Sequence, residues 1–187
     1  MPFIETGFSG LLIFEPKVFE DSRGYFFESY NERAFHEQGI DVKFVQDNQS
    51  SSAYGVIRGL HYQLPPFAQT KLVRVLSGRI IDVAVDIRKG SPTYGGVFKI
   101  ELSSGNKKQL LIPHGFAHGF SVLSAQAEVL YKCDNFYNRE SEGGIYFNDA
   151  SLAIDWEIPV EHQIISDKDQ HNPMLTQIKN SFEYQEK

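Results

Sequence analysis

The sequence has a single cysteine and no long apolar run. Cys133 stands alone among the 187 residues, so an internal disulfide is excluded and a reducing compartment is favoured. Cys133 itself is expected to be a small core residue. No apolar run approaches the roughly 18 residues of a membrane span, and the N-terminus MPFIETGFSG does not resemble a signal peptide. We therefore expect a cytoplasmic protein without a membrane partner.

The sequence also has fewer basic than acidic residues. The chain has 18 basic and 24 acidic residues, which gives a formal net charge of −6. This balance excludes a broad surface for nucleic acid, because such a surface neutralises many phosphates at once. Arginines are scattered through the chain, among them those at positions 23, 58, 74, 79, 88 and 139. A small anionic ligand would therefore need a site that folding assembles from distant segments.

The chain has no internal repeat, low-complexity tract or block of like charge. Its 41% hydrophobic and 13% aromatic residues suffice for one sizeable core. We predict a single domain over residues 1–187, in which 173–187 forms a helical or extended tail. One short helix is expected at 31–38, where Asn31 can cap it and Gly39 can end it, and a second near 173–184.

Glycine, proline, asparagine and aspartate separate short apolar segments throughout the chain, which is typical of an all-β fold. Ser77-Gly78 predicts a hairpin between the strands on either side of it. Strands of this number and length favour a sandwich or a barrel of the jelly-roll kind. The ten predicted strands lie at 11–19, 24–30, 43–48, 55–63, 71–78, 79–87, 96–103, 108–113, 116–123 and 127–137.

Four predicted strands each place one ionisable side chain, His61, Lys71, His118 or Tyr131, on a face that looks apolar. Side chains two residues apart share a face of a strand. Each group alone is explained by a satisfied structural residue or by a lysine that reaches water. Together they favour a shared wet cavity. The groupings are Lys71 with Val73 and Val75, Tyr131 with Val129 and Cys133, His118 with Phe116, Phe120 and Val122, and His61 with Ile57 and Gly59.

Residues 56–63, VIRGLHYQ, add an arginine to this set. Regular alternation would put Arg58 on the face of Leu60 and Tyr62, opposite His61. Gly59 permits a bulge that would re-aim Arg58. We therefore predict an irregularity at Gly59, and without it Arg58 is an ordinary surface residue.

Two further segments carry clustered charges. DSRGYFFES combines Arg23, Phe26 and Glu28, a cation, a ring and an acceptor that suit a nucleotide, and the alternative is an exposed strand. IISDKDQ contains Asp167 and Asp169, and it is either a solvated turn or the source of a carboxylate for a histidine. Such a carboxylate fixes the tautomer of the imidazole and makes its free nitrogen a better base.

The ordered motifs resemble those of the dTDP-4-dehydrorhamnose 3,5-epimerases, dTDP-sugar isomerases of the cupin class. The resemblance runs from about Gly10 to Pro173, and DSRGYFFES matches the nucleotide-binding segment of that family. It implies a double-stranded β-helix jelly-roll barrel, a homodimer, and conversion of dTDP-4-dehydro-6-deoxy-D-glucose to dTDP-4-dehydro-L-rhamnose by inversion at C3 and C5. The matching segments are QDNQSSSAYGVIRGLHYQLPPFAQTKLVRVLSGRIIDVAVDIRKGSPTYG, IPHGFAHGF, EVLYKCDNFY and SDKD.

The same resemblance implies a role for each candidate residue. His61 matches the general base, Asp169 its dyad partner, Tyr131 the acid on the opposite face of the sugar, and Lys71 the group beside the C4 carbonyl. Asp167 stays open as an alternative to Asp169. Phe26 and Glu28 would serve the nucleotide of the neighbouring subunit. The positions that match ligand contacts are Arg23, Glu28, Gln46, Asn48, Arg58, His118, Glu142 and Lys168, with Tyr137 as the ring that stacks on thymine.

The expected chemistry explains these residue types. A proton beside a ketone is acidic only if the enolate is stabilised, and a cationic Lys71 at O4 would supply that stabilisation. Inversion also requires a base and an acid on opposite faces of the ring. No cofactor is expected, and the sequence has no glycine-rich dinucleotide loop.

Three alternatives stay open. PHGFAH resembles half of a cupin metal motif, but a metal-dependent oxygenase needs more ligands than the single histidine of GLHYQ, so we expect no metal. A non-catalytic nucleotide-sugar-binding jelly roll would keep Arg23 and Arg58 but could dispense with Lys71 and Tyr131. A mono-epimerase would act at C3 or at C5 alone.

Overall fold

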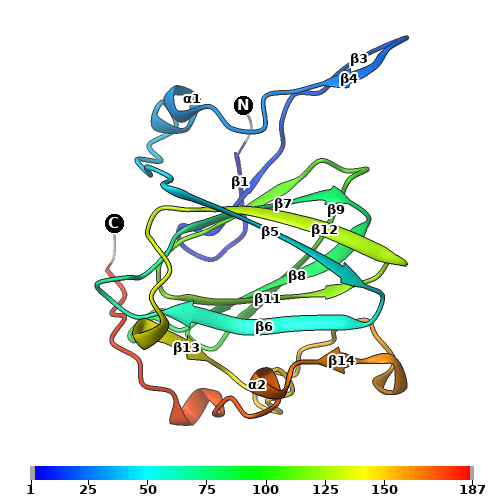
Figure 1. Cartoon of the computed structure of the whole chain (residues 1–187). Helices are drawn as coiled ribbons and strands as arrows, with labels where there is room; N and C mark the ends of the chain where they lie inside the picture. Colours follow the sequence, from blue (N-terminus) through cyan, green and yellow to red (C-terminus); the bar gives the residue numbers. More distant parts are fainter. Residues whose placement is uncertain (1–2, 186–187) are drawn as a thin grey trace.

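The computed structural model describes residues 3–185, which form a mostly β structure of two facing, largely antiparallel sheets (Figure 1). The all-β class predicted from the sequence is confirmed. Across the first sheet the strands are β1 (Phe3–Glu5), β2 (Leu12–Phe14), β10 (Gln109–Ile112), β7 (Lys71–Ser77), β12 (Gln126–Cys133) and β5 (Gln46–Ala53). Across the second they are β13 (Glu142–Gly144), β6 (Val56–Gln63), β11 (Phe116–Val122), β8 (Arg79–Asp86) and β9 (Val97–Ser103), with β14 (Ile164–Ile165) parallel to β6.

Two kinds of smaller element complete the fold. A hairpin of β3 (Phe19–Asp21) and β4 (Gly24–Phe26) projects away from both sheets (Figure 1). No helix within residues 3–185 is long and apolar enough to cross a membrane. The helical elements are α1 (Glu32–His36), α2 (Asp167–Gln170) and the 3-10 turns η1 (Arg139–Ser141), η2 (Val160–His162) and η3 (Leu175–Gln177).

The core between the sheets contains inward side chains from both of them. Val73 and Val75 of β7 belong to the same buried cluster as Val129 of β12 and Phe116 and Phe120 of β11. These are the side chains that strand alternation placed on one face, so the predicted inward faces of these strands are confirmed. Lys71, His118 and Tyr131 share those faces, which directs them to the space between the sheets.

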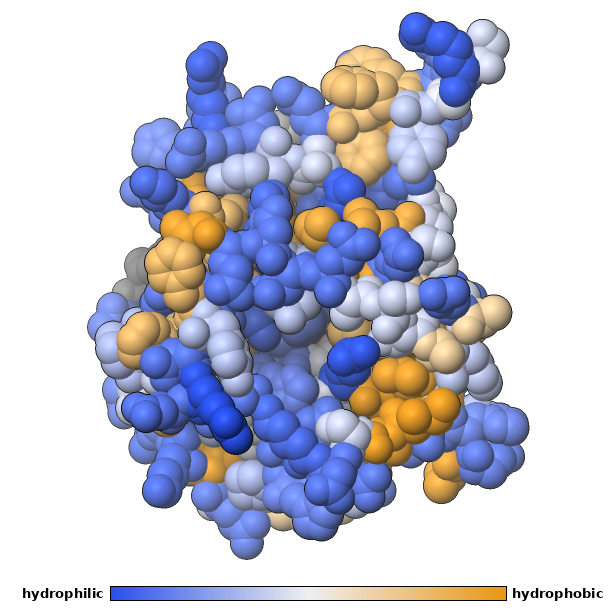
Figure 2. Space-filling model, in the orientation of Figure 1, coloured by the Kyte–Doolittle hydropathy of each residue, from blue (hydrophilic) through white to orange (hydrophobic). Residues whose placement is uncertain are grey.

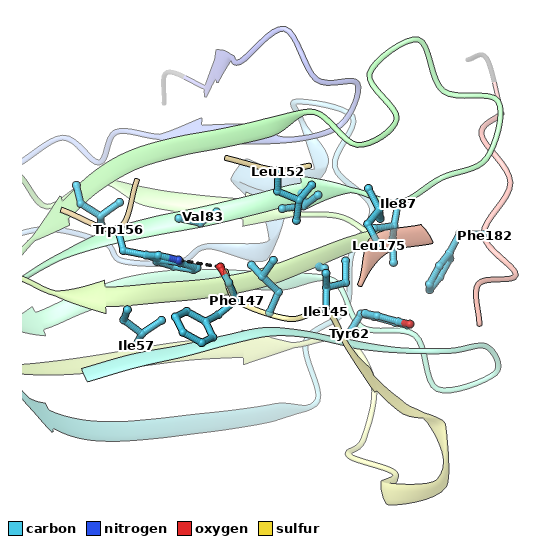
Figure 3. Close-up of a cluster of buried hydrophobic side chains, with 14 of the residues drawn as sticks. Ile57, Tyr62, Val83, Ile87, Ile145, Phe147, Leu152, Trp156, Leu175 and Phe182 are labelled. Carbon is cyan, nitrogen blue, oxygen red and sulfur yellow. Dashed lines mark hydrogen bonds between the residues drawn. The ribbon is translucent and has the colours of Figure 1, made fainter. Parts of the chain in front are cut away.

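A second core covers the outer face of the second sheet (Figure 3). Ile57 and Tyr62 of β6 and Val83 of β8 pack there against side chains from the C-terminal third of the chain. Trp156 lies in this cluster, and its indole N–H donates a hydrogen bond to the carbonyl oxygen of Phe147 at 2.9 Å. The C-terminal segment is thereby held against β6, which is the strand that carries His61.

The hairpin predicted at Ser77-Gly78 is wrong, because β7 and β8 lie in different sheets. β7 pairs with β10 and β12, whereas β8 pairs with β11 and β9. Gly78 has a φ of +80°, and a Cβ there would lie 2.2 Å from the carbonyl oxygen of Gln126. The chain therefore crosses from one sheet to the other at this glycine, and both strands contribute to the shared core.

Several predicted strand boundaries also differ from the structure. The segment 11–19 contains β2 and the start of β3, and 24–30 contains only β4. The segment 43–48 was placed too early, because β5 continues to Ala53. β12 pairs with β5 without interruption from Cys133 to Gln126, so every residue of the polar run QDNQSSSA lies opposite a residue of β12. β1, β13 and β14 were not predicted.

The helix expected at 31–38 is present as α1. The side chain of Asn31 accepts a hydrogen bond from the backbone N–H of Ala34 at 3.3 Å, and Gly39 follows the helix with a φ of +75°. Phe35 points into the protein and packs against Phe14 with ring centroids 5.2 Å apart. This confirms the predicted cap and termination.

The helix predicted near 173–184 is wrong, because η3 is the helical element of that segment. The later part is extended and pairs with the loop after β8. The carbonyl oxygen of Phe182 accepts from the N–H of Lys89 at 2.9 Å, and the N–H of Tyr184 donates to the carbonyl of Lys89 at 2.8 Å. Insertion of Phe182 into the outer core favours this extended path over a helix.

Candidate active site

A pocket of about 430 Å³ opens between the two sheets, and Figure 2 shows it as a hollow surrounded largely by hydrophilic side chains. His61, Lys71, His118 and Tyr131 all line it, and they come from β6, β7, β11 and β12. The shared cavity inferred from strand alternation is therefore present. The other lining residues are Ser50, Val56, Ile57, Arg58, Gly119, Phe120, Ile164, Ile165, Ser166, Lys168 and Asp169.

A smaller pocket of about 130 Å³ shares His61, Lys71 and Tyr131 with the first. These three side chains therefore stand where the two hollows meet. The remaining lining residues are Gln46, Asn48, Tyr62, Gln63, Gln69, Tyr137 and Glu142.

His61 is paired with Asp169 rather than with Asp167. The Nε2 atom of His61 lies 2.6 Å from Oδ1 of Asp169, whose other oxygen accepts a hydrogen bond from the N–H of Gly59 at 3.3 Å. Asp169 lies on α2, and Ser166 caps that helix by accepting from the N–H of Asp169 at 3.1 Å. The side chain of Asp167 is 98% exposed. The turn considered for this segment is thus a short helix that brings a carboxylate to the imidazole.

The environment of Asp169 favours its charged form. Burial raises the pKa of this carboxyl, but the hydrogen bond and the charge of His61 and the N–H of Gly59 outweigh burial, so the pKa lies below its usual value. A carboxylate in contact with one imidazole nitrogen holds the proton on that nitrogen and leaves the other nitrogen able to accept one.

The predicted irregularity at Gly59 is confirmed. The pairing of β6 with β11 shifts between the His61–His118 pair and the Arg58–Phe120 pair, so β6 carries one extra residue there. A Cβ on Gly59 would lie 2.5 Å from the Cα of Gly119. Because of the bulge, Arg58 and His61 line the same pocket. The Nε atom of Arg58 donates to the hydroxyl oxygen of Ser52 at 3.0 Å.

Lys71 and Tyr131 are neighbours in the wall of both pockets. The Nζ atom of Lys71 is 5.7 Å from the centroid of the Tyr131 ring. Burial lowers the pKa of Lys71, and the nearby Cys133, Asp82 and Glu142 oppose this effect. Burial also raises the pKa of Tyr131, so its hydroxyl keeps its proton at neutral pH.

Cys133 is a buried core residue, as expected. Burial raises the pKa of its thiol to about 11. Asn48 donates a hydrogen bond to its sulfur at 3.6 Å. Cys133 therefore stays a neutral thiol at neutral pH.

A second histidine–carboxylate pair was missed by the sequence analysis. The Nε2 atom of His118 lies 2.5 Å from Oδ1 of Asp82, and both side chains are buried. Asp82 lies on β8 between Ile80 and Ala84, which belong to the core between the sheets. The alternation rule that grouped the other four residues would also have placed Asp82 on this inward face.

Four predicted contact residues, Gln46, Asn48, Tyr137 and Glu142, line the smaller pocket, and Lys168 of the larger pocket contacts one of them. Lys168 lies 2.5 Å from Oε1 of Glu142, and the hydroxyl of Tyr137 donates to Oε2 of Glu142 at 3.1 Å. Burial raises the pKa of Glu142, but the hydrogen bond and charge of Lys168 outweigh burial, so that pKa lies below its usual value. Gln46 donates to Asn48 at 3.1 Å and accepts from the N–H of Tyr137 at 3.1 Å.

Arg23, Phe26 and Glu28 line neither of the two pockets around His61 in their own chain. Arg23 lies at the turn of the projecting hairpin and pairs with Asp21 at 2.6 Å (Figure 1). The side chain of Phe26 is exposed, and Glu28 accepts a hydrogen bond from Asn31 at 3.3 Å. Within this chain the hairpin is thus an exposed segment with unburied aromatic rings.

The segment PHGFAH, which resembles half of a cupin metal motif, belongs to no cluster of metal ligands in the described part of the chain. Within residues 3–185, no group of three or more histidine, cysteine, aspartate or glutamate side chains is placed to hold a metal ion. His61 and His118 are each engaged by a carboxylate instead.

Comparison with known proteins places this geometry in a family. The family model for dTDP-4-dehydrorhamnose 3,5-epimerase matches residues 5–177. A protein of that name from Shigella flexneri is 56% identical over 170 residues, which cover 90% of this chain and 93% of the relative. A crystal structure of a dTDP-6-deoxy-D-glucose-3,5-epimerase from Legionella pneumophila, in complex with dTDP-4-keto-L-rhamnose, has a TM-score of 0.94 at 48% identity and covers 99% of both chains. The chain therefore belongs to the dTDP-4-dehydrorhamnose 3,5-epimerase family.

Proposed function

We propose that this protein, an epimerase by its family, inverts C3 and C5 of dTDP-4-dehydro-6-deoxy-D-glucose and so produces dTDP-4-dehydro-L-rhamnose. His61 is the base, Tyr131 the acid and Lys71 the cation at the C4 ketone. These three side chains come from different strands and line one pocket, which is the observation that carries the proposal. The Legionella pneumophila relative was crystallised with dTDP-4-keto-L-rhamnose, the product named here.

Proton abstraction begins at His61. Because Asp169 engages Nε2, Nδ1 is the nitrogen left to take a proton from the carbon beside the ketone. The pair of electrons left on that carbon moves to O4 and forms an enolate. Lys71 stabilises this oxyanion. Burial lowers the pKa of Lys71, and the negative charges of Asp82 and Glu142 oppose that effect. Tyr131 then donates its proton to the opposite face of the same carbon, which inverts it.

The nucleotide part of the substrate binds to the polar side chains that line the two pockets. Arg58 binds the diphosphate, and the ring of Tyr137 stacks on thymine. This assignment is supported by the position of Arg58 on the larger pocket and of Tyr137 on the smaller one. The remaining contacts of the chain with the substrate come from Gln46, Asn48, His118, Glu142 and Lys168.

A homodimer completes this site. Arg23, Phe26 and Glu28 of each subunit contact the nucleotide in the site of its partner. The projecting hairpin supports this arrangement, because it carries large exposed rings that a monomer leaves in water; these are Phe19, Tyr25 and Phe26. We further infer that residues 1–187 form one cytoplasmic domain, that the two sheets close into a cupin-type barrel, and that the reaction needs no cofactor or metal.

The decisive experiment is incubation with dTDP-4-dehydro-6-deoxy-D-glucose in heavy water, coupled to a reductase that traps the product. Deuterium at both C3 and C5 is the expected result. Label at one of these carbons would identify a mono-epimerase instead, and a solved 3'-monoepimerase shares the fold with a TM-score of 0.86 at 27% identity. Absence of label at both carbons would contradict the proposal.

A further inference from the structure

Ser50 is a polar group of the pocket for which the reaction described above has no role. It lies on β5, where Asn48, Ser50 and Ser52 point to the interior and the residues between them are exposed. Ser50 lines the larger pocket together with Arg58 and Tyr131. Its position on a polar strand explains why apolar patterning did not reveal it.

The hydroxyl oxygen of Ser50 is buried and has no hydrogen-bond partner within residues 3–185. The neighbouring serines are satisfied: Ser51 accepts from the side-chain amide of Gln126 at 2.6 Å, and Ser52 accepts from Nε of Arg58 at 3.0 Å. Buried hydroxyls are almost always hydrogen-bonded, because losing water without a replacement is costly. A hydroxyl of this kind on a pocket wall is suited to a partner that the ligand supplies.

The surroundings determine which chemistry that partner must have. Ser52 anchors Arg58 two residues further along the same face of β5, which places both Ser50 and Arg58 at this end of the pocket. A guanidinium offers only hydrogen-bond donors, and a hydroxyl can add one more. An anionic oxygen is the acceptor that satisfies both groups, because hydrogen bonds to charged oxygens are the stronger ones.

We propose that Ser50 is a further substrate-binding residue, whose hydroxyl donates a hydrogen bond to a diphosphate oxygen of the nucleotide sugar beside Arg58. This inference rests on the proposed function, because it takes the nucleotide sugar as the ligand. Ser50 binds the substrate and takes no part in the proton transfers.

The test compares Ser50→Ala with Ser51→Ala, whose side chain lies on the exposed face of the same strand. Calorimetric titration with dTDP should show roughly tenfold weaker binding for Ser50→Ala, as loss of one charge-assisted hydrogen bond predicts. Ser51→Ala should bind dTDP as the wild type does. The KM of Ser50→Ala should rise while kcat at saturating substrate is retained.

Thermal unfolding without ligand separates this role from a structural one. Removing a hydroxyl that has no protein partner should leave the melting temperature of Ser50→Ala unchanged or slightly raised. A lower melting temperature would overturn the proposal, because it would mean that the hydroxyl bonds within the protein. Unchanged dTDP affinity would also overturn it. A wild-type protein that binds dTDP but incorporates no deuterium would contradict the proposed function and not this binding role.

Discussion

Nε2 of His61 lies 2.6 Å from Oδ1 of Asp169, although 108 positions separate the two residues in the sequence. The second oxygen of Asp169 accepts from the N–H of Gly59, within the bulge that aims Arg58 into the pocket. One carboxylate on α2 thus holds both the imidazole and the irregular backbone beside it. The positions of His61 and Gly59 on β6 therefore depend on contacts with the C-terminal segment.

Replacing Asp169 should therefore impair the base. We expect Asp169→Asn to lower kcat/KM by at least a hundredfold, because an amide cannot favour the required tautomer and charge of His61. Asp167→Asn is the matched control, since its exposed side chain does not contact His61. Coupled assays on both variants, with circular dichroism to check folding, measure the difference. A larger loss for Asp167→Asn would refute the assignment of the dyad.

Gly59 should tolerate no side chain. A Cβ at this position would lie 2.5 Å from the Cα of Gly119 and 2.9 Å from the carbonyl oxygen of His118, both of them backbone atoms. We expect Gly59→Ala to lower the free energy of unfolding by on the order of 3 kcal/mol. Gly105→Ala is the control, because the nearest atom to its Cβ is 3.6 Å away. Urea unfolding that finds the two variants equally stable would contradict this expectation.

The buried carboxylate of Asp86 should make the free energy of unfolding depend on pH in the acid range. It accepts hydrogen bonds from Arg88 at 2.7 Å, Ser91 at 2.6 Å and Thr93 at 2.7 Å. Burial raises the pKa of Asp86, but these donors outweigh burial, so the folded-state pKa lies below its usual value. A lowered folded-state pKa contributes stability that is present above about pH 4 and is lost as the pH falls through that pKa.

Asp86→Asn should therefore have a lower free energy of unfolding than the wild type at neutral pH. Below about pH 4 its free energy of unfolding should fall less steeply than that of the wild type. The control is Asp41→Asn, whose side chain is 93% exposed. Unfolding free energies measured between pH 3 and pH 7 test both variants. If Asp86→Asn kept the full acid dependence of the wild type, the stabilising role of this carboxylate would be disproved.

The proposed sharing of each site between two subunits predicts complementation between inactive variants. Arg23→Ala and His61→Ala should each be weakly active or inactive alone. After subunit exchange, mixed dimers carry one site with both residues intact, so about a quarter of wild-type activity should return in an equal mixture. Each variant incubated with itself is the control. If size-exclusion chromatography shows dimers but the mixture stays inactive, Arg23 does not serve the partner's site.

Strand alternation predicted much of the site. It placed Lys71, His118 and Tyr131 on inward faces, and these three line one pocket with His61. The grouping of His61 with Ile57 was wrong, because the irregularity at Gly59 separates their faces and Ile57 packs in the outer core. The same rule applied to β8 would have added Asp82. The same rule could not identify Ser50, because β5 is polar on both faces. This strand is stabilised by pairing with β12 and not by an apolar pattern.

The predicted hairpin and C-terminal helix failed because they rest on contacts that no local pattern encodes. β7 and β8 look like a hairpin in isolation, but their pairing partners come from distant strands in opposite sheets. The extended tail is stabilised by the insertion of Phe182 into the outer core and by backbone pairing with Lys89. Both outcomes depend on surfaces that exist only after the sheets have assembled.

The sequence by itself determined the all-β class and the side of each strand on which the reactive groups lie, because the pleat has a period of two residues. It also indicated the bulge at Gly59, because glycine permits the irregular backbone that a bulge requires. Tertiary structure decided that Asp169 and not Asp167 meets His61, and that Asp82 pairs with His118. Those pairings join segments far apart in the chain, and hydrogen bonding over such separations is decided by packing and not by local preference.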